Sequence, residues 1–428
     1  MRNGYFQEQK MIDRDDLRLV SSAEELPSAR AHPSVTPLEM EILTAIRRDG
    51  ELTKAHLVLS TLYSRSKING CISALLKKNY IKAAGPGDYT GGRRSLKFSL
   101  SGDLGLVAGV DIGATSFDLL LADMTGKVYA RCSEPGTVRE GPLPVLERIS
   151  GLLEKMVLES GWTTDRLLGV GIGVPGPVDF ARGMLVSPPI MPGWDGFPII
   201  QTVQKRFPSA RAVVDNDVNV MALGEQSRGE SRKHDNSIFV KIGTGIGAGI
   251  ICNGRIYRGT NGCAGDIGHI SVKKDGPLCP CGNRGCLEAM AAGPAIAERG
   301  VQAVLEGRSS ILQKYYEANG QALRAEDVGR GAGEGDPASI DIIRESGQMI
   351  GDVLASLVNF HNPGAIVIGG GVSNLGNLLL SSIRQAVLNR SLPLATRDLR
   401  IVFSATGVDA GVFGAVALAN ENVFMLES

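Results

Sequence analysis

Hydrophobic positions in the first hundred residues recur at the spacing of short helices. Over residues 38–76 they are separated mainly by three or four positions, which predicts helices over about 38–46, 57–62 and 68–76. Two further runs, 80–83 and 96–100, have the composition of strands and flank the turn-rich segment 85–94. Three helices followed by a two-stranded hairpin are typical of a winged helix-turn-helix domain.

From Leu106 onward the pattern changes to short apolar runs bounded by glycine or polar residues. Helical segments such as 144–159 and 339–359 lie between several of these runs. Alternation of buried strands with helices predicts an α/β domain whose sheets are largely covered. The expected strands are 106–112, 119–122, 168–173, 212–215, 237–242, 247–252, 365–368 and 401–405.

The formal net charge of zero conceals an uneven distribution along the 428 residues. Residues 46–100 contain 11 Lys and Arg against 3 Asp and Glu, a net charge of +8, which leaves −8 for the rest of the chain. A basic segment that coincides with a predicted helix-turn-helix favours DNA binding. A solvated basic surface is the alternative explanation.

Residues 1–35 mix charged, small and proline residues without periodicity, and we expect a loosely ordered extension there. The N-terminus lacks the apolar stretch of an export signal, and no run approaches the roughly 18 apolar residues of a membrane span. We therefore expect a cytoplasmic protein without a membrane partner.

The strongest chemical signal is a group of one histidine and three cysteines. His269 precedes Cys279, Cys281 and Cys286, and the cysteines have the spacing Cys-x-Cys-Gly-x-x-Gly-Cys. One imidazole and three thiolates form the closed tetrahedral shell of structural zinc, and the glycines allow so short a loop to fold around one ion. Three free cysteines near an unrelated histidine are the alternative.

Two glycine-containing loops follow apolar strands and resemble one another. In the first, Asp111, Gly113 and Thr115 place a carboxylate, a turn and a hydroxyl at a strand end, which suits a magnesium-bound phosphate but also an ordinary hairpin. The second loop, 243–249, contains Gly243, Thr244 and Gly245 and leads into another strand, which excludes a Rossmann fold. Together the loops suggest two walls around one phosphate chain.

A third polar group, Asp215-Asn216-Asp217-Val218-Asn219, follows the predicted strand 212–215. A carboxylate beside an amide can accept the proton of a sugar hydroxyl while the amide holds the neighbouring hydroxyl, as phosphoryl transfer to an alcohol requires. A helix cap is the alternative, and it explains Asp215 more readily than the whole group.

These pieces occur in the order seen in the ROK family of sugar kinases and transcriptional repressors, which the chain resembles from Leu38 to about Ala419. The resemblance implies an actin-like two-lobed fold, with ATP phosphates between the two loops and adenosine near Gly369, Gly370 and Gly371. The motifs that carry it are 264–269 with the cysteine loop, 171–179, Asn216-Asp217, and Asn362-Pro363 before 366–371.

The resemblance also implies site residues. Asn216, Asp217, His269 and Glu288 correspond to sugar contacts, and Asp217 would be the catalytic base in a kinase. Asp266 stands where the family usually has Glu, one methylene longer, so we expect an altered or water-bridged sugar contact. Ala114 stands where kinases usually have a second glycine, which weakens the inference of ATP binding.

The resemblance gives a division into domains. Residues 36–104 would be the winged helix-turn-helix, 105–220 together with 402–428 the first α/β lobe, and 221–401 the second lobe with the zinc loop.

Residues 53–57 and 64–69 resemble the helix-turn-helix of the repressor members, although Leu62 and Tyr63 replace the usual Gly-Leu of its turn. The second segment would lie in the major groove and the basic turn would reach the minor groove. The residues expected to face DNA are Ser64, Arg65, Lys67, Asn69, Arg93 and Arg94.

Two functions follow from this sequence. The first is a sugar-responsive transcription factor, most simply a repressor, whose homodimer or homotetramer binds a double-stranded operator and is controlled by a sugar or sugar phosphate. The second is an ATP- and Mg²⁺-dependent sugar kinase that carries a DNA-binding module. The sequence leaves open which sugar is bound, which operator is recognised and whether binding represses or activates.

Overall fold

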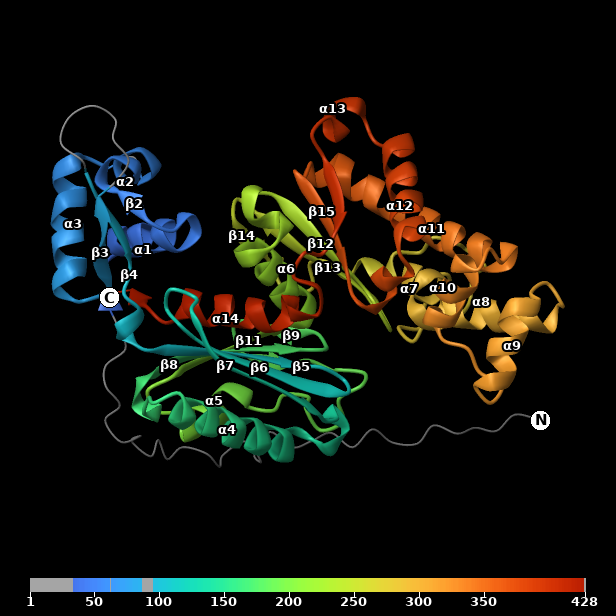
Figure 1. Cartoon of the computed structure of the whole chain (residues 1–428), viewed down its shortest axis with the longest axis horizontal. Helices are drawn as coiled ribbons and strands as arrows, with labels where there is room; N and C mark the ends of the chain where they lie inside the picture. The colour runs from blue at the N-terminus through green and yellow to red at the C-terminus, as the bar shows by residue number, and fades with distance from the viewer. Residues whose placement is uncertain (1–33, 62, 87–94, 427–428) are drawn as a thin grey trace, which may run out of the picture.

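The computed structural model describes residues 34–61, 63–86 and 95–426. Residues 1–33 of the predicted extension, Arg93, Arg94 and most of the predicted turn over 85–94 lie outside these ranges. Figure 1 shows a small N-terminal unit, defined here as residues 34–104, and two α/β lobes, each built on its own five-stranded sheet. The predicted two-lobed α/β architecture is confirmed.

The N-terminal unit packs three helices against a three-stranded antiparallel sheet of order β2-β4-β3. Thr36 and Glu39 cap the first helix reciprocally, each side chain accepting the backbone N–H of the other, and the helix ends at Gly50, whose φ is +83°. The elements are α1 (Pro37–Asp49), β2 (Leu52–Thr53), α2 (Lys54–Thr61), α3 (Arg65–Lys77), β3 (Ile81–Pro86) and β4 (Leu96–Leu100).

The first lobe has the strand order β11-β8-β5-β6-β7. In the central strand β5 every residue except Asp111 is buried, as its continuous apolar run predicts. Helices α4 and α5 cover one face of this sheet (Figure 1). The elements are β5 (Leu106–Ile112), β6 (Ser116–Asp123), β7 (Val128–Pro135), α4 (Pro142–Glu159), β8 (Leu167–Val174), β9 (Val178–Asp179), β10 (Met184–Leu185), α5 (Ile199–Arg206) and β11 (Arg211–Asn216).

The second lobe repeats this topology: written in the same direction as the first, its strand order is β16-β15-β12-β13-β14. In both sheets the first two pairs of neighbours are parallel and the last two are antiparallel. Strand β16 (Arg400–Phe403) runs across the predicted domain boundary between 401 and 402. The other elements are β12 (Ser237–Ile242), β13 (Ile246–Cys252), β14 (Arg255–Tyr257), α7 (Leu287–Ala291), α8 (Gly293–Leu305), α9 (Ser310–Ala318), α10 (Ala325–Gly333), α11 (Pro337–His361), β15 (Ala365–Gly369), α12 (Asn377–Arg390) and α13 (Pro393–Thr396).

The longest described helix, α11, has 25 residues and packs along α12. Gly347 and Gly351 face α12 at positions where a side chain would press on Ser382 and Ala386. Within the described ranges, no helix is long and apolar enough to cross a lipid bilayer.

Helices α6 (Asp217–Arg228) and α14 (Ala410–Asn422) cross between the two sheets. Helix α6 follows the first sheet but packs against β12 and β13 of the second, whereas α14 follows the second sheet and packs against β5 and β8 of the first (Figure 1). Glycines allow this close approach: a methyl group on Gly224 would overlap the Ala410 carbonyl, and one on Gly414 would overlap the Val220 carbonyl.

The C-terminal end of α14 joins the N-terminal unit. Ala419, Val423 and Phe424 share one hydrophobic core with the apolar faces of α1 and α3. The Arg47 guanidinium donates to the Asn420 carbonyl over 3.1 Å, and strand β1 (Ser34–Val35) pairs in parallel with β17 (Met425–Leu426). Helix α14 therefore contacts the first sheet, α6 and the N-terminal unit.

We expect Gly414→Ala to lower the midpoint of thermal unfolding, because the added methyl group must push the backbones of α6 and α14 apart. Overpacking of this kind costs about 1–3 kcal/mol. The matched control is Gly151→Ala in α4, where a methyl group meets nothing within 4 Å and better helix propensity favours a small gain. Equal midpoints for the two variants would show that the helix crossing does not depend on Gly414.

Candidate functional site

Three charged side chains meet where the two sheets face each other. Asp217, the first residue of α6, is buried, and its Oδ2 lies 2.5 Å from Nζ of Lys241 on β12. Asp111, at the end of β5, is close enough to both for its ionisation to depend on them. We call Asp111, Asp217 and Lys241 the charge cluster; it combines one cation with two carboxyl groups from different elements.

The charge cluster perturbs its own titration. Burial raises the pKa of Asp111 to about 7; the Asp217 carboxylate adds to this rise and the Lys241 ammonium opposes it. The Asp217 carboxylate in turn raises the pKa of Lys241. Lys241 therefore keeps its charge at neutral pH, and Asp111 takes up a proton more readily than an ordinary aspartate.

The residues beside Asp217 serve mainly to hold the backbone. Asn216 caps α6: its Oδ1 accepts the Val218 N–H over 2.9 Å and its Nδ2 donates to the Gly176 carbonyl over 2.8 Å. The helix-cap interpretation is thus right for Asn216 and wrong for Asp215. Buried Asp215 instead pairs with Arg258, 2.7 Å away, which stacks on Phe180.

Glu288 connects the cysteine loop to the second glycine loop. It lies in the first turn of α7, and its Oε2 accepts the Ile246 N–H over 2.9 Å, directly after Gly245. The His269 N–H donates to the Asp266 carbonyl over 3.3 Å, and a methyl group on Gly268 would lie 3.3 Å from Cβ of Glu288, so the three residues are neighbours. Partial burial raises the pKa of Asp266, His269 opposes this rise, and Glu288 adds a smaller one. The structure therefore brings Asp266, His269 and Glu288 together beside the glycine loop.

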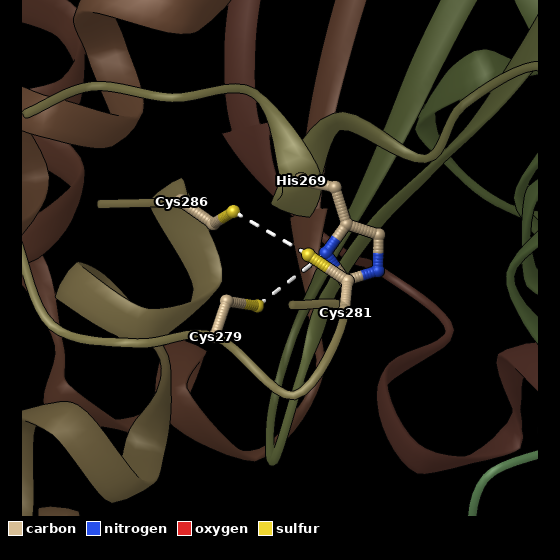
Figure 2. Close-up of side chains that lie close together, drawn as sticks. All are labelled: His269, Cys279, Cys281 and Cys286. Atoms are coloured by element: carbon tan, nitrogen blue, oxygen red, sulfur yellow. Dashed lines mark hydrogen bonds between the residues drawn. The ribbon is translucent and has the colours of Figure 1, made fainter. Parts of the chain in front are cut away.

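His269 and the three cysteines form a compact group, called the metal cluster here (Figure 2). Their ligand atoms all lie within 4.8 Å of one another. Sγ of Cys281 is 3.7 Å from Sγ of Cys286, and Nδ1 of His269 is 3.7 Å from Sγ of Cys279. Zinc with Zn–S bonds of about 2.3 Å separates tetrahedral ligands by about 3.6–3.8 Å. The donor set and its spacing fit this ion.

The metal cluster combines buried and exposed ligands. Cys279 and Cys286 are buried, whereas Cys281 and His269 are exposed. A backbone N–H from Asn283 lowers the pKa of Cys281 to about 7, and burial raises the pKa of Cys286 to about 12. Because Nδ1 of His269 faces the thiols, Nε2 is left for a second partner (Figure 2).

The remaining loop residues stand at the ends of β5, β12 and β15. The Gly113 N–H donates to the Ser116 carbonyl over 2.8 Å, and the Gly243 N–H donates to the Gly245 carbonyl over 2.9 Å, so the second turn is one residue tighter than the first. Gly370, with φ of +85°, packs its backbone on Ile242. Thr115, Thr244 and Ala114 are exposed, and Gly369 is buried against Phe239.

Four predicted DNA-facing residues lie on the exposed side of α3 or at its start. Ser64 caps the helix by accepting the Lys67 N–H, and Arg65, Lys67 and Asn69 are exposed. Nζ of Lys67 also lies 5.6 Å from the centre of the Tyr63 ring. Ile68 and Ile72, on the opposite face, are buried in the core of the unit.

Sequence reasoning missed Lys241 and Arg258. Lys241 is the only charged residue in the apolar strand 237–242, two positions before the glycine loop, and this break in the pattern was the available signal. Arg258 had no local signal, because its partner Asp215 is 43 residues away in the chain.

Comparisons with known proteins place the chain. It is 32% identical to a glucokinase of Halalkalibacterium halodurans over 74% of this chain and 96% of that protein, and 30% identical to a xylose repressor of Caldicellulosiruptor bescii over 83% of this chain and 88% of that protein. A crystal structure of a ROK family transcriptional regulator, a homologue of the E. coli MLC protein, superposes with a TM-score of 0.77 at 25% identity, covering 90% of this chain and 96% of that one. The sequence model of the ROK family matches residues 107–422, and the chain belongs to this family.

Proposed function

We propose that the protein is a sugar-responsive, DNA-binding transcription regulator, most simply a repressor of carbohydrate-metabolism genes. The observation that carries this proposal is the N-terminal unit, which presents an exposed basic helix and shares its core with α14. The family match begins only at residue 107. The xylose repressor aligns over 83% of the chain, whereas the glucokinase, itself covered over 96%, aligns over 74%.

In this proposal the N-terminal unit is a winged helix-turn-helix. Helix α3 enters the major groove with Arg65, Lys67 and Asn69, and Arg93 and Arg94 reach the minor groove. A homodimer or homotetramer places two such helices on half-sites about 34–36 Å apart. The +8 charge of residues 46–100 supplies the attraction to phosphates.

The effector, a sugar or sugar phosphate, binds between the lobes. Asn216 keeps one amide hydrogen for a hydroxyl after capping α6, and Asp217, Asp266, His269 and Glu288 offer further polar contacts. A sugar hydroxyl that accepts a hydrogen bond from Lys241 or donates one to Asp217 changes the surroundings of their ion pair. Because Asp217 begins α6, which crosses α14, the ligand can favour one arrangement of the lobes and of the attached unit.

The metal cluster is proposed to hold a structural zinc ion through His269, Cys279, Cys281 and Cys286. The ion would supply a closed tetrahedral anchor rather than an open catalytic position. It would fix His269 and, two residues after the last thiolate, Glu288, so that the zinc braces the sugar contacts.

The DNA-binding proposal is tested with an operator selected from random duplexes by the full-length protein. Arg65→Ala should weaken operator binding by about tenfold or more, the value of one base or phosphate contact. A member of a sugar panel should release the operator from the parent protein. Fluorescence anisotropy at several salt concentrations measures both effects.

The matched control for this test is Arg308→Ala, an exposed arginine in the second lobe, which should leave operator affinity unchanged. A protein that retains no duplex even at low salt, or an Arg65→Ala variant that binds as well as the parent, would contradict the DNA-binding proposal.

Elemental analysis should find about one zinc per chain. Cys281→Ser should lose this metal and bind sugar more weakly, because His269 and Glu288 are then no longer held in place by the ion. Cys263→Ser is the matched control, since Cys263 is equally exposed and lies outside the metal cluster. Purified protein without zinc, or a Cys281→Ser variant that retains zinc at parental affinity, would contradict the proposed zinc site at the metal cluster.

A second candidate function is an ATP- and Mg²⁺-dependent sugar kinase. Asp217 as base, the loop residues Asp111, Gly113, Thr115, Gly243, Thr244, Gly245, Gly369 and Gly370, and the similarity to a glucokinase favour it. The charge cluster argues against it, because Oδ2 of Asp217 is already paired with the Lys241 ammonium 2.5 Å away, and burial raises the pKa of Asp111, whereas Mg²⁺ requires a carboxylate.

We expect no sugar-dependent release of ADP when the protein is incubated with ATP, Mg²⁺ and a sugar panel, and no change on Asp217→Asn. A glucokinase serves as positive control for the coupled assay. Sugar-dependent turnover that falls by a factor of about 100 or more in Asp217→Asn, as loss of a general base predicts, would establish the kinase instead.

A further inference from the structure

A cavity of about 960 Å³ lies between the N-terminal unit and both lobes. Helix α1, the β6–β7 turn, α6, the β13–β14 turn and α14 all contribute to its wall. Its volume is within the range of sites for small organic ligands. None of the candidate sugar, ATP or DNA residues named above lines it.

The charge of the cavity wall is strongly unbalanced. Five arginines face two glutamates, Glu51 and Glu421. Arginine side chains are rarely brought together around a cavity without an anionic partner, because like charges repel and each loses hydration. The five are Arg47 and Arg48 of α1, Arg228 of α6, and Arg255 and Arg258 of the second lobe.

Three of these arginines are already engaged. Arg48 pairs with Asp49, 2.9 Å away, and Arg258 with Asp215, 2.7 Å away. Arg228 donates to the Gly126 carbonyl and stacks on the Phe413 ring, 4.5 Å from its centre.

The other two, Arg47 and Arg255, form no ion pair with a carboxylate of the described residues. Over the described ranges, the Arg47 guanidinium donates only to the Asn420 carbonyl, and the Arg255 guanidinium makes no hydrogen bond or ion pair. Burial lowers the pKa of Arg47, the Glu421 carboxylate opposes this change, and the charge of Arg255 adds a smaller lowering. Both side chains line the same cavity from different parts of the fold, and among the described residues of its wall the carboxylates are those of Glu51 and Glu421.

We propose that this cavity binds a small phosphate monoester, with its phosphate between Arg47 and Arg255. Guanidinium groups donate paired, planar N–H groups that match phosphate oxygens. The amides of Gln226, Asn253 and Asn422 also line the cavity and can bind hydroxyls of the organic part. A double-stranded DNA backbone fits less well, because α3 does not contribute to the wall.

The ligand would act on the position of the N-terminal unit. Arg47 belongs to that unit and Arg255 to the second lobe, so a shared phosphate ties them together. This consequence rests on the proposed regulator function, whereas the binding itself does not. The protein would then respond to two small molecules, one between the lobes and one at this junction.

The test is calorimetric titration of the full-length, zinc-loaded protein with inorganic phosphate, glucose 6-phosphate and glucose at neutral pH. Saturable binding of a phosphate compound is expected, weakened about tenfold or more in Arg255→Gln and in Arg47→Gln, the value of a hydrogen bond to a charged group. Arg255 is exposed, so its variant folds without loss of packing. Arg308→Gln is the matched control and should bind like the parent.

The outcomes separate the possible ligands and sites. Tighter binding of glucose 6-phosphate than of phosphate supports the monoester, and equal affinities identify free phosphate as the ligand. The proposal is overturned if neither phosphate compound gives a saturable binding heat up to about 10 mM, or if binding is unchanged in both Arg47→Gln and Arg255→Gln.

Phosphate binding lost in Asp217→Asn also overturns it, because the ligand then belongs between the lobes. A protein that binds its operator but no phosphate compound contradicts this inference alone. A protein that binds phosphate but no operator contradicts only the regulator proposal.

Discussion

The backbone contact between α6 and α14 is the constraint on which the rest of the structure depends. Gly224 and Gly414 each stand where a side chain would overlap a carbonyl of the opposite helix. Only this close approach lets two helices fit between the sheets and exchange partners, each packing on the sheet that the other one follows. Since α6 begins at Asp217 and α14 ends in the core of the N-terminal unit, one crossing joins the candidate ligand site to the candidate DNA-binding surface.

Charged contacts complement this apolar crossing and link the two lobes. Asp215 of β11 reaches Arg258 beyond β14, Asp217 reaches Lys241 on β12, and buried Glu225 of α6 accepts from Ser404 and Thr406 before α14. Asp215 and Glu225 also accept from close sequence neighbours, but their contacts across the molecule, like the ion pair of Asp217, last only while the lobes keep their relation. A ligand that supplies replacement contacts for Asp217 therefore changes the free-energy difference between arrangements of the lobes.

The sequence predicted most of this framework but few of its long-range contacts. Strands 106–112 and 237–242 match their predicted bounds, because each is an apolar run that ends in a glycine turn. Strand β7 was missed because it is a half-exposed edge with Arg131 and Glu134 among its residues. The metal cluster was visible as a local motif. The Lys241–Asp217 pair was not, since it requires knowing that α6 packs on the second sheet, and neither was the glycine crossing, because helical glycines look alike until their neighbours are known.

The metal cluster and the charge cluster are connected through the second glycine loop. Glu288, which follows the cysteine loop, accepts the Ile246 N–H at the start of β13. Lys241 lies on β12, the strand on the other side of the same loop, and its side chain pairs with Asp217. A metal ion that fixes His269 and Glu288 therefore also restrains the turn that sets the direction of Lys241. If Asp217 binds a sugar hydroxyl, as we propose, the rigidity of this turn would limit how far the Lys241 ammonium can move in response, and so how much of the free energy of binding is left to shift α6.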